Sequence, residues 1–229
     1  MLTEYETFYV EWSAGLQVIG IIDYGMGNLR SVQKALERLG GRAEFISSPS
    51  QLANCPSVIL PGVGAFRDAI RELHRQDFVA AIQDYAQSGR SLLGICLGMQ
   101  LLFDRSFEDG DYEGLGIIKG DVVRFHPEPG LKIPHMGWNS LEFAANEHPL
   151  LNGLSTESYV YFVHSYYVRP ASPQVITAQT QHGSQKFVSM IGQSNVFAAQ
   201  FHPEKSQQVG LRILKNFVNL NIACDLKES

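Results

Sequence analysis

SLLGICLG, residues 91–98, joins an apolar run to a cysteine that is flanked by glycines. The run at 91–95 predicts a buried β-strand, and a helical pattern begins near Leu97, so the cysteine lies in a strand-to-helix turn. Gly94, Cys96 and Gly98 match the G-x-S-x-G elbow pattern, with Cys in place of Ser. Such a turn exposes its central side chain, and the glycines let neighbouring backbone pass closely. This stretch therefore predicts an α/β fold with a nucleophile at position 96.

The chain before the elbow alternates short apolar runs with amphipathic segments. One helix places Leu29, Val32, Leu36 and Leu39 at helical spacing, with Asn28 as its N-cap and two glycines as its stop. The alternation predicts βαβ units and a mainly parallel open sheet with helices on both faces. The expected strands are 17–23, 42–47 and 57–62, and further helices are expected across 64–75 and 77–88.

The pattern of apolar and polar residues changes after about residue 114. Strand-like runs at 114–124, 157–168, 173–180 and 186–200 follow one another without long helices between them, which predicts antiparallel additions to the sheet. A closing helix is expected at about 206–221. No repeat or linker interrupts the chain. We therefore expect one domain over residues 17–229, preceded by an N-terminal extension over residues 1–16.

The bulk composition narrows the class of protein. The net charge is −5 and no basic run occurs, which argues against nucleic acid as a partner. Three scattered cysteines suit neither a disulfide framework nor the short spacing of a zinc site, so we expect a reducing compartment and no metal or cofactor. The first fifteen residues lack the basic start and apolar core of a secretory signal, and no run is long enough to span a membrane. A cytoplasmic protein is expected.

Cys96 has the features of an activated nucleophile. The start of the following helix favours thiolate over thiol, and the amide of Leu97 is placed to donate to a developing oxyanion. Free cysteines most often pack in the core, so a buried core thiol is the alternative. The elbow context favours the nucleophile for Cys96, whereas Cys55 and Cys224 lack such a context and are expected to be core residues.

A catalytic cysteine needs a base, and His202 is the best placed of seven histidines. It follows an apolar run at 195–201, at the kind of strand end where α/β active sites gather. Glu204, two residues on, would lie on the same side of an extended segment and hold the imidazole in its tautomer. A turn with solvated charges is the alternative. His135 and His164 lie in apolar surroundings and are candidates for a pocket or for a structural role, while the other four histidines are expected at the surface.

The loop Pro61-Gly62-Val63-Gly64 follows the strand expected to neighbour the elbow strand. A glycine-rich loop there can turn a peptide N–H toward a substrate carbonyl and supply the second donor of an oxyanion hole. A simple strand-to-helix turn is the alternative.

In this order and spacing, PGVGAF, GICLGMQLLF and FHPEKS resemble the motifs of the class I (triad) glutamine amidotransferases, and the similarity covers residues 17–222. DYGMGN, PHMGWN and HPEKS are most similar to the glutaminase subunits of imidazole glycerol phosphate synthases. The resemblance implies that Cys96 attacks the glutamine amide to form a thioester, that His202 shuttles protons and that Glu204 orients His202. It further implies that the substrate is bound by Gly62, Val63, Gly64, Leu97, Gln100, Ser165 and Tyr166.

The same resemblance implies a partner. In that family the ammonia enters a (β/α)8-barrel cyclase subunit, with which the glutaminase forms a heterodimer. There it helps to convert a phosphoribulosyl-formimino aminoimidazole carboxamide nucleotide into imidazole glycerol phosphate and an aminoimidazole carboxamide ribonucleotide, in histidine biosynthesis. Asn28, Trp138 and Lys205 would then lie near the interface, with a core aromatic as an equal alternative for Trp138. The rival hypotheses are the glutaminase of a chorismate-using or pyridoxal-phosphate-forming synthase, and a regulatory subunit that binds glutamine without turnover.

Overall fold

The computed structural model describes residues 18–144 and 148–225, with only the backbone described beyond residue 220. Its centre is an eight-stranded sheet with the order β2-β1-β3-β4-β14-β13-β12-β9. The first five strands of that order run parallel, and the last three join antiparallel. The parallel strands are β1 (Val18–Ile22), β2 (Arg42–Ile46), β3 (Ser57–Gly62), β4 (Ser91–Cys96) and β14 (Val196–Ala199); the antiparallel strands are β9 (Glu142–Phe143), β12 (Ile176–His182) and β13 (Gln185–Gln193).

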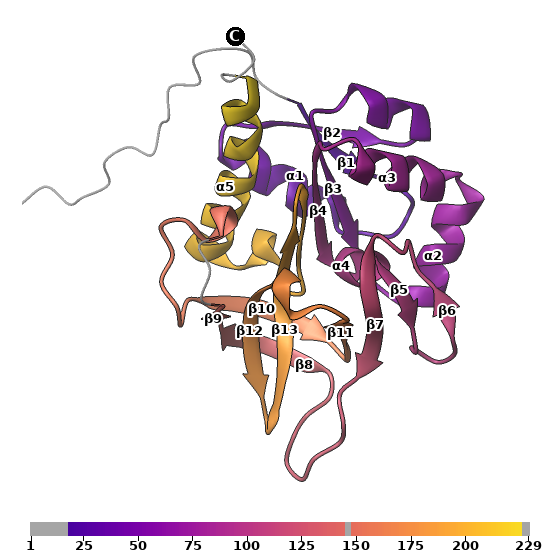
Figure 1. Ribbon diagram of the computed structural model, residues 1–229. Helices are drawn as coiled ribbons and strands as arrows, with labels where there is room; N and C mark the ends of the chain where they lie inside the picture. The colour runs from indigo at the N-terminus through magenta and orange to yellow at the C-terminus, as the bar shows by residue number, and fades with distance from the viewer. Residues whose placement is uncertain (1–17, 145–147, 226–229) are drawn as a thin grey trace, which may run out of the picture.

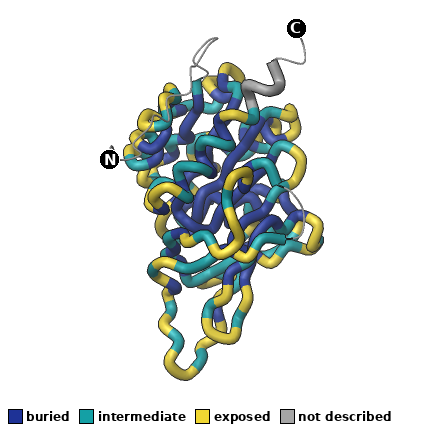
Figure 2. Tube along the Cα trace, turned by 90° about the vertical axis from the view of Figure 1, so that its left-hand side faces the viewer, coloured by how far each residue is buried: buried dark blue, intermediate teal, exposed yellow. Residues whose placement is uncertain are grey.

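Helices cover both faces of this sheet, as the alternating pattern predicts (Figure 1). One apolar cluster joins a face of the sheet to α2 (Phe66–Arg75) and α3 (Phe78–Gln87). A second cluster joins the opposite face to α1 (Leu29–Arg38) and α5 (Gln207–Asp225). The central strands are consequently buried along most of their length, and exposed residues are concentrated in the loops (Figure 2). Buried on both faces, the parallel strands read as continuous apolar runs.

The second half of the chain adds two smaller sheets. One pairs β8 (His135–Ser140) with β10 (Tyr159–His164) in antiparallel register. The other has the order β11-β7-β5-β6. Its strands are β5 (Phe103–Ser106), β6 (Tyr112–Glu113), β7 (Ile118–Arg124) and β11 (Tyr166–Pro170). Short 3-10 turns complete the chain: η1 (Pro49–Asn54), η2 (Pro149–Leu151), η3 (Pro173–Val175) and η4 (Pro203–Lys205).

The structure differs from the sequence-based expectations in three places. Asn28 occupies the N-cap position of α1, but its side chain makes no capping hydrogen bond to the described residues, and its carbonyl accepts from Ser31 N instead. The helix after the elbow, α4 (Leu97–Leu101), is only five residues long because the chain enters β5 at Phe103. Strands β5, β6, β8 and β9 are absent from the prediction, since each is short or carries polar residues on both faces. The expected extension over residues 1–16 lies outside the described residues.

Candidate active site

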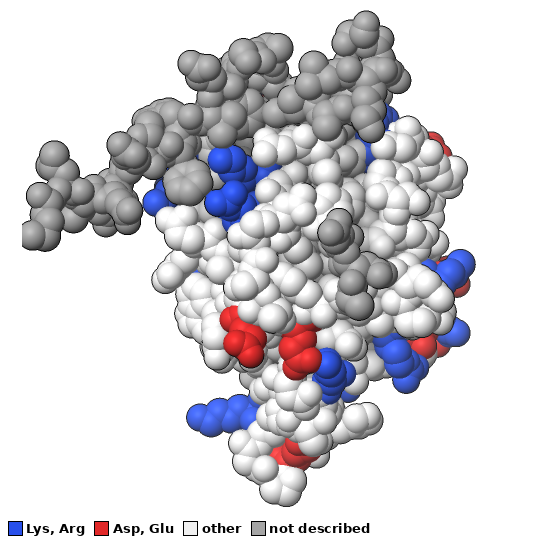
Figure 3. Space-filling view, turned by 60° about the vertical axis from the view of Figure 1, so that its left-hand side comes forward, with Lys and Arg blue, Asp and Glu red and all other residues white. Residues whose placement is uncertain are grey.

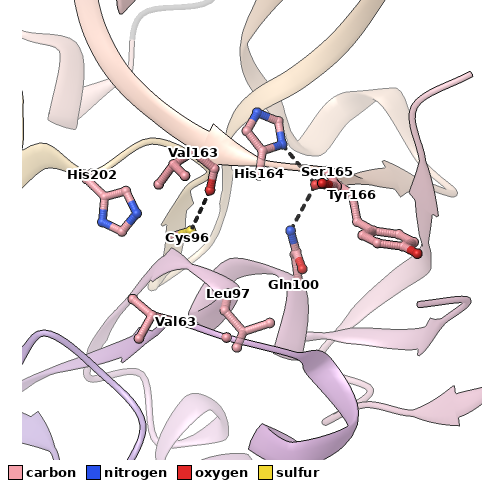
Figure 4. Close-up of a pocket in the computed structure, with 10 residues that line it drawn as sticks. Val63, Cys96, Leu97, Gln100, Val163, His164, Ser165, Tyr166 and His202 are labelled. Atoms are coloured by element: carbon pink, nitrogen blue, oxygen red, sulfur yellow. Dashed lines mark hydrogen bonds between the residues drawn. The ribbon is translucent and has the colours of Figure 1, made fainter. Parts of the chain in front are cut away.

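The carboxyl ends of three parallel strands meet at one pocket. Strand β4 pairs with β3 on one side and with β14 on the other, and Gly62 lies opposite Cys96 in the register. His202 follows the end of β14, as expected for an α/β active site. In Figure 4 the Cys96 sulfur and the His202 ring lie at one end of the pocket and Tyr166 lies at the other. The lining residues are Val63, Gly64, Cys96, Leu97, Gln100, Val163, His164, Ser165, Tyr166 and His202.

The backbone at Cys96 has the strained geometry of a nucleophile elbow. Its φ of 56° and ψ of −111° lie in a region that residues with a Cβ rarely adopt. The two flanking glycines are required by close contact, because a Cβ on Gly98 would lie 1.9 Å from the Leu60 carbonyl oxygen and one on Gly94 would lie 2.9 Å from the Gly98 oxygen. The sequence motif is therefore explained by sterics: only glycine lets β4 and α4 pack this closely against β3.

Cys96 is 7 % exposed and opens into the pocket. Its sulfur lies 3.8 Å from Gln200 Nε2, which is placed to donate to it, and 4.0 Å from the Val163 carbonyl. Gln200 is fully buried, and its Oε1 accepts from Gln100 Nε2 at 3.0 Å. Sequence reasoning missed Gln200. The sequence pattern that indicates it is a glutamine inside the apolar run VFAAQF. A polar side chain in a buried strand needs hydrogen-bond partners.

His202 and Glu204 form a buried pair. The Nδ1 of His202 lies 2.8 Å from Glu204 Oε1, and the side chains are 3 % and 1 % exposed. The alternative of a turn with solvated charges is therefore excluded. The segment is not extended as expected, because Pro203 starts the 3-10 turn η4 and Glu204 folds back beside the imidazole. Ser206 Oγ donates to the His202 carbonyl at 2.7 Å and fixes this turn.

The protonation of His202 is set by its two neighbours. Burial acts to lower the pKa of His202, but Cys96 and Glu204 outweigh it and raise the pKa to about 10. Nε2 is buried and has no hydrogen-bond partner among the described residues. Since Nδ1 is held by Glu204, Nε2 is the nitrogen left to exchange a proton inside the pocket.

The glycine-rich loop borders the pocket on the β3 side. Val63 is 39 % exposed, and Gly64 has a φ of +96°, which favours glycine. Gly62 does not line the pocket itself but packs beneath the elbow, where a Cβ would lie 2.9 Å from the Leu97 Cβ. A simple turn would not require this contact. The structure thus places the loop and the Leu97 amide at the same end of the site as Cys96.

Gln100, Ser165 and Tyr166 form the other end of the pocket. Gln100 Nε2 donates to the Tyr166 carbonyl and to Gln200 Oε1, both at 3.0 Å, so its donor group is engaged within the protein. The Ser165 carbonyl accepts from Phe125 N at 3.1 Å. The backbone of this segment is therefore fixed by hydrogen bonds within the protein. Its side chains are left to contact a ligand in the pocket.

Two of the remaining histidines were correctly expected in apolar surroundings. His135 Nδ1 and His164 Nε2 lie 3.1 Å apart, and His164 also lines the pocket. Burial lowers the pKa of His135 to about 4 and that of His164 to about 3, so both are neutral near pH 7. His148 and His182, both expected at the surface, are only partly exposed. His148 is partly buried and caps η2, and the His182 ring stacks on His135 at a centroid distance of 4.1 Å.

Asn28, Trp138 and Lys205 all lie at the surface. Trp138 is 46 % exposed, so the alternative of a core aromatic is excluded. Asn28 lines a small hollow together with Gly62, His202 and Glu204, which places it directly behind the buried pair. Cys55, by contrast, is buried with its sulfur on the Gln51 carbonyl at 3.6 Å, and burial raises the pKa of its thiol, as expected for a core cysteine. The side chain of Cys224 lies outside the described residues.

Among the described residues, no three histidine, cysteine or acidic side chains gather in the way that a metal ion requires, and no helix is both long and apolar enough to cross a membrane.

Comparison with known proteins gives one consistent group. The sequence profile of the family described as glutamine amidotransferase class-I matches residues 20–220. The imidazole glycerol phosphate synthase subunit HisH of Gloeothece citriformis is 50 % identical over 204 residues, covering 89 % of this chain and 96 % of that protein. The protein of the same name in Syntrophotalea carbinolica is 52 % identical over 205 residues, covering 87 % and 98 %.

Solved structures share the fold at lower sequence identity. The structure of PurLQS from Thermotoga maritima superposes with a TM-score of 0.72 at 20 % identity and covers 90 % of this chain and 99 % of that one. A crystal structure of a glutamine amidotransferase gives a TM-score of 0.70 at 21 % identity, with coverage of 90 % and 99 %. The mainly parallel sheet with antiparallel additions is thus a fold known from glutamine amidotransferases.

Proposed function

Because this chain belongs to the class I glutamine amidotransferase family, we propose that it is the glutaminase subunit of imidazole glycerol phosphate synthase. In this function it hydrolyses glutamine to glutamate and ammonia and serves histidine biosynthesis. The observation that carries the proposal is the pocket at the end of β4, which Cys96 on its elbow and His202 both line, with Glu204 buried beside His202. We further propose that residues 17–229 form one catalytic domain and that the protein acts in the cytoplasm.

The chemistry starts at the Cys96 sulfur. A thiolate attacks the side-chain amide carbon of glutamine, and the carbonyl oxygen becomes an oxyanion. The imidazolium of His202, protonated because its pKa is raised to about 10, gives a proton from Nε2 to the departing nitrogen. Ammonia leaves, and the γ-glutamyl group remains on the sulfur as a thioester. Neutral His202 then takes a proton from water, which attacks the thioester, releases glutamate and restores the thiolate.

Glu204 orients this proton transfer. Its Oε1 accepts from Nδ1, so the exchangeable proton is confined to Nε2, on the side of the pocket. Its negative charge also stabilises the imidazolium while the thiolate is present. The oxyanion is held by the Leu97 amide and by an amide of the Val63-Gly64 segment, both of which border the Cys96 end of the pocket.

The amino-acid end of glutamine binds at the opposite end of the pocket. Gln100 Nε2 is already engaged by Tyr166 and Gln200, so Gln100 offers the substrate an acceptor oxygen, which suits the α-ammonium group. Ser165 and Tyr166 form the rest of this wall. Glutamine bound in this way places its amino-acid end at Gln100 and its side-chain amide at Cys96.

The ammonia is used by a partner, which we propose to be a (β/α)8-barrel cyclase that forms a heterodimer with this chain. Relatives at 50–52 % identity are named as subunits of a synthase. The small β8–β10 sheet exposes three large apolar side chains, Met136, Trp138 and Tyr159, with exposures of 62 %, 46 % and 58 %. A group of this kind on a soluble protein marks an interaction site. Asn28 and Lys205 flank the catalytic pair and complete the proposed interface.

The test is activity with and without the cyclase partner and its nucleotide. The isolated chain should hydrolyse glutamine slowly, and the complex with nucleotide should hydrolyse it much faster. Cys96→Ala should reduce glutamine hydrolysis by at least about 10⁴-fold. The same variant complex should still form product from added ammonium, because only ammonia production is lost. Cys55→Ala is the matched control, since it removes a buried cysteine outside the pocket and should retain activity.

The rivals give different outcomes. A glutaminase of a chorismate-using or pyridoxal-phosphate-forming synthase would lose glutamine hydrolysis in Cys96→Ala, but the cyclase and its nucleotide would not stimulate the wild type. A regulatory glutamine-binding subunit would show no turnover with any partner. The buried His202–Glu204 pair beside Cys96 favours turnover, because a binding site for glutamine needs no proton donor at that place.

A further inference from the structure

A groove beside α1 and α5 is not used by the proposed reaction. It lies between the end of α1, the turn at 153–154 and the first turns of α5. Its volume is about 530 Å³, against about 190 Å³ for the active-site pocket, so it can receive several side chains. The lining residues are Arg38, Leu39, Gly153, Leu154, Gln208, Val209, Leu211, Arg212 and Lys215.

The groove combines an apolar floor with a basic rim. Leu39, Leu154, Val209 and Leu211 are partly buried and continue the apolar cluster under α1 and α5. Arg38, Arg212 and Lys215 supply three positive charges, and none of the described residues that line the groove is acidic. Figure 3, which brings the α5 side of the molecule forward, shows Lys and Arg side chains gathered in its upper part. A fitting occupant is therefore acidic and rich in large apolar side chains.

The first seventeen residues of this chain have that composition. The segment MLTEYETFYVEWSAGLQ carries Glu4, Glu6 and Glu11 and no lysine or arginine, so its side chains supply three negative charges. The segment also carries four aromatic side chains, those of Tyr5, Phe8, Tyr9 and Trp12. The negative charge of this segment thus matches the basic rim of the groove, and its aromatic side chains match the apolar floor.

The segment also reaches the groove. It joins the fold at Val18, which pairs with Arg42 at the edge of the sheet, and Leu39 of the groove lies three residues before Arg42. From the strand spacing and the length of three residues, the join lies within about 15 Å of Leu39. The lining from Gln208 to Lys215 extends about 10 Å along α5, whereas seventeen residues span up to about 56 Å.

We propose that the N-terminal segment, residues 1–17, docks in this groove of its own chain, with its glutamates at the basic rim and its aromatic side chains on the apolar floor. The segment then ties the end of α1 to the first half of α5. Because α5 follows directly after η4, this contact also supports the turn that carries Glu204.

Zero-length carbodiimide cross-linking of the full chain tests the proposal, since it joins a lysine to a carboxylate only where the two are in contact. We expect a cross-link between Lys215 and a glutamate of residues 1–17, at a yield similar to that of Lys119 with Asp104, which are paired at 2.8 Å. Lys215→Arg keeps the charge and removes the cross-link. A mixture of ¹⁴N and ¹⁵N protein should give cross-linked peptides of single isotope composition. Absence of the Lys215 product while the Lys119 product forms would overturn the proposal, and so would peptides of mixed isotopes, which mean docking on a second copy.

Thermal unfolding gives an independent readout. Glu4→Gln, Glu6→Gln and Glu11→Gln together should lower Tm by about 2–4 °C at low salt, with a smaller difference at high salt because exposed charges are screened. The matched control replaces three exposed acidic residues outside the groove, Asp77→Asn, Glu113→Gln and Glu157→Gln. If both triple variants change Tm equally, the glutamates act through net charge and the docking is refuted.

Discussion

Gln200 connects the two ends of the active site through one buried amide. Its Nε2 faces the Cys96 sulfur at 3.8 Å, and its Oε1 accepts from Gln100 Nε2. Gln200→Leu keeps the volume but removes both contacts. We expect kcat/KM for glutamine to fall about tenfold. This factor corresponds to the loss of one hydrogen bond that contributes about 1.4 kcal/mol. Steady-state kinetics of the activated complex measure this, with Gln193→Leu, at an exposed position on β13, as the control. Equal kinetics for wild type and Gln200→Leu would show that the amide has no part in the reaction.

Glu204 makes the stability of the protein depend on pH through His202. The pKa of His202 is lowered by burial but raised by Cys96 and Glu204, to about 10, against about 6.5 in an unfolded chain. A raised pKa stabilises the fold fully below about pH 6.5, and this contribution is lost as pH rises toward about 10. Glu204→Gln lowers the pKa of His202. We therefore expect its deficit in unfolding free energy to be largest at and below about pH 6.5 and to shrink toward pH 10.

Urea unfolding at several pH values measures this deficit, and the imidazole NMR signal of His202 reports its pKa directly. A deficit that stays constant from pH 6.5 to pH 10 would contradict the expectation, because it would mean that Glu204 acts by packing alone. Equilibrium unfolding and NMR titration require no partner, so this prediction is independent of the proposed pathway.

Among the elements, the junction of β3, β4 and α4 is the most constrained. The glycine at position 98 allows α4 to start against the β3 backbone, since an added Cβ would lie 1.9 Å from the Leu60 oxygen. Gly98→Ala must therefore separate the two elements, and we expect a loss of at least about 3 kcal/mol in unfolding free energy. Gly130→Ala is the control: it has a φ of +79° but no atom within 4 Å of an added Cβ. Its smaller loss measures backbone strain without a clash; equal losses would show that the contact at Gly98 relaxes freely.

The elements predicted from sequence are those with a continuous apolar signal. The parallel strands β1, β3 and β4 are buried on both faces, and their apolar runs set their positions almost to the residue. The strand β8 reads HMGWNS, in which both faces carry polar or exposed residues, and no periodicity marks it. The segment from His202 to Glu204 likewise has no periodic pattern, and the expectation that it is extended is wrong. The contact between His202 and Glu204 was predicted correctly although the backbone conformation was not, because the short spacing permits it in either conformation.

At the scale of the whole molecule, the site residues converge from distant parts of the chain. Cys96 was identified from its own motif, but Gln200 and the hydrogen bonds of His164 depend on tertiary neighbours that no local pattern encodes. The fold also places the active-site pocket, the proposed partner interface and the basic groove at different parts of the molecule. The pocket opens at the carboxyl edge of the parallel sheet, the exposed apolar side chains lie on β8 and β10, and the basic groove lies along α5.

The proposed interface predicts which surface substitutions affect the partner. Trp138→Ala removes an exposed aromatic side chain from β8, and Lys205→Ala removes an exposed charge next to Glu204. We expect Trp138→Ala to weaken cyclase binding by about tenfold or more, because aromatic side chains contribute most of the affinity at interfaces. Lys205→Ala should chiefly reduce the stimulation of glutaminase by nucleotide, since the residue lies in the turn that positions Glu204.

Titration of the cyclase by calorimetry and by activity separates these two effects. Lys119→Ala is the matched control, because Lys119 is exposed on β7 and pairs with Asp104 away from β8 and η4. It should change neither affinity nor stimulation. If Trp138→Ala and Lys205→Ala also leave both quantities unchanged, the partner binds elsewhere, and the exposed apolar side chains of β8 and β10 need another explanation. A loss of affinity in Trp138→Ala with normal basal hydrolysis would place the interface on the β8–β10 sheet and confine catalysis to the pocket of Cys96.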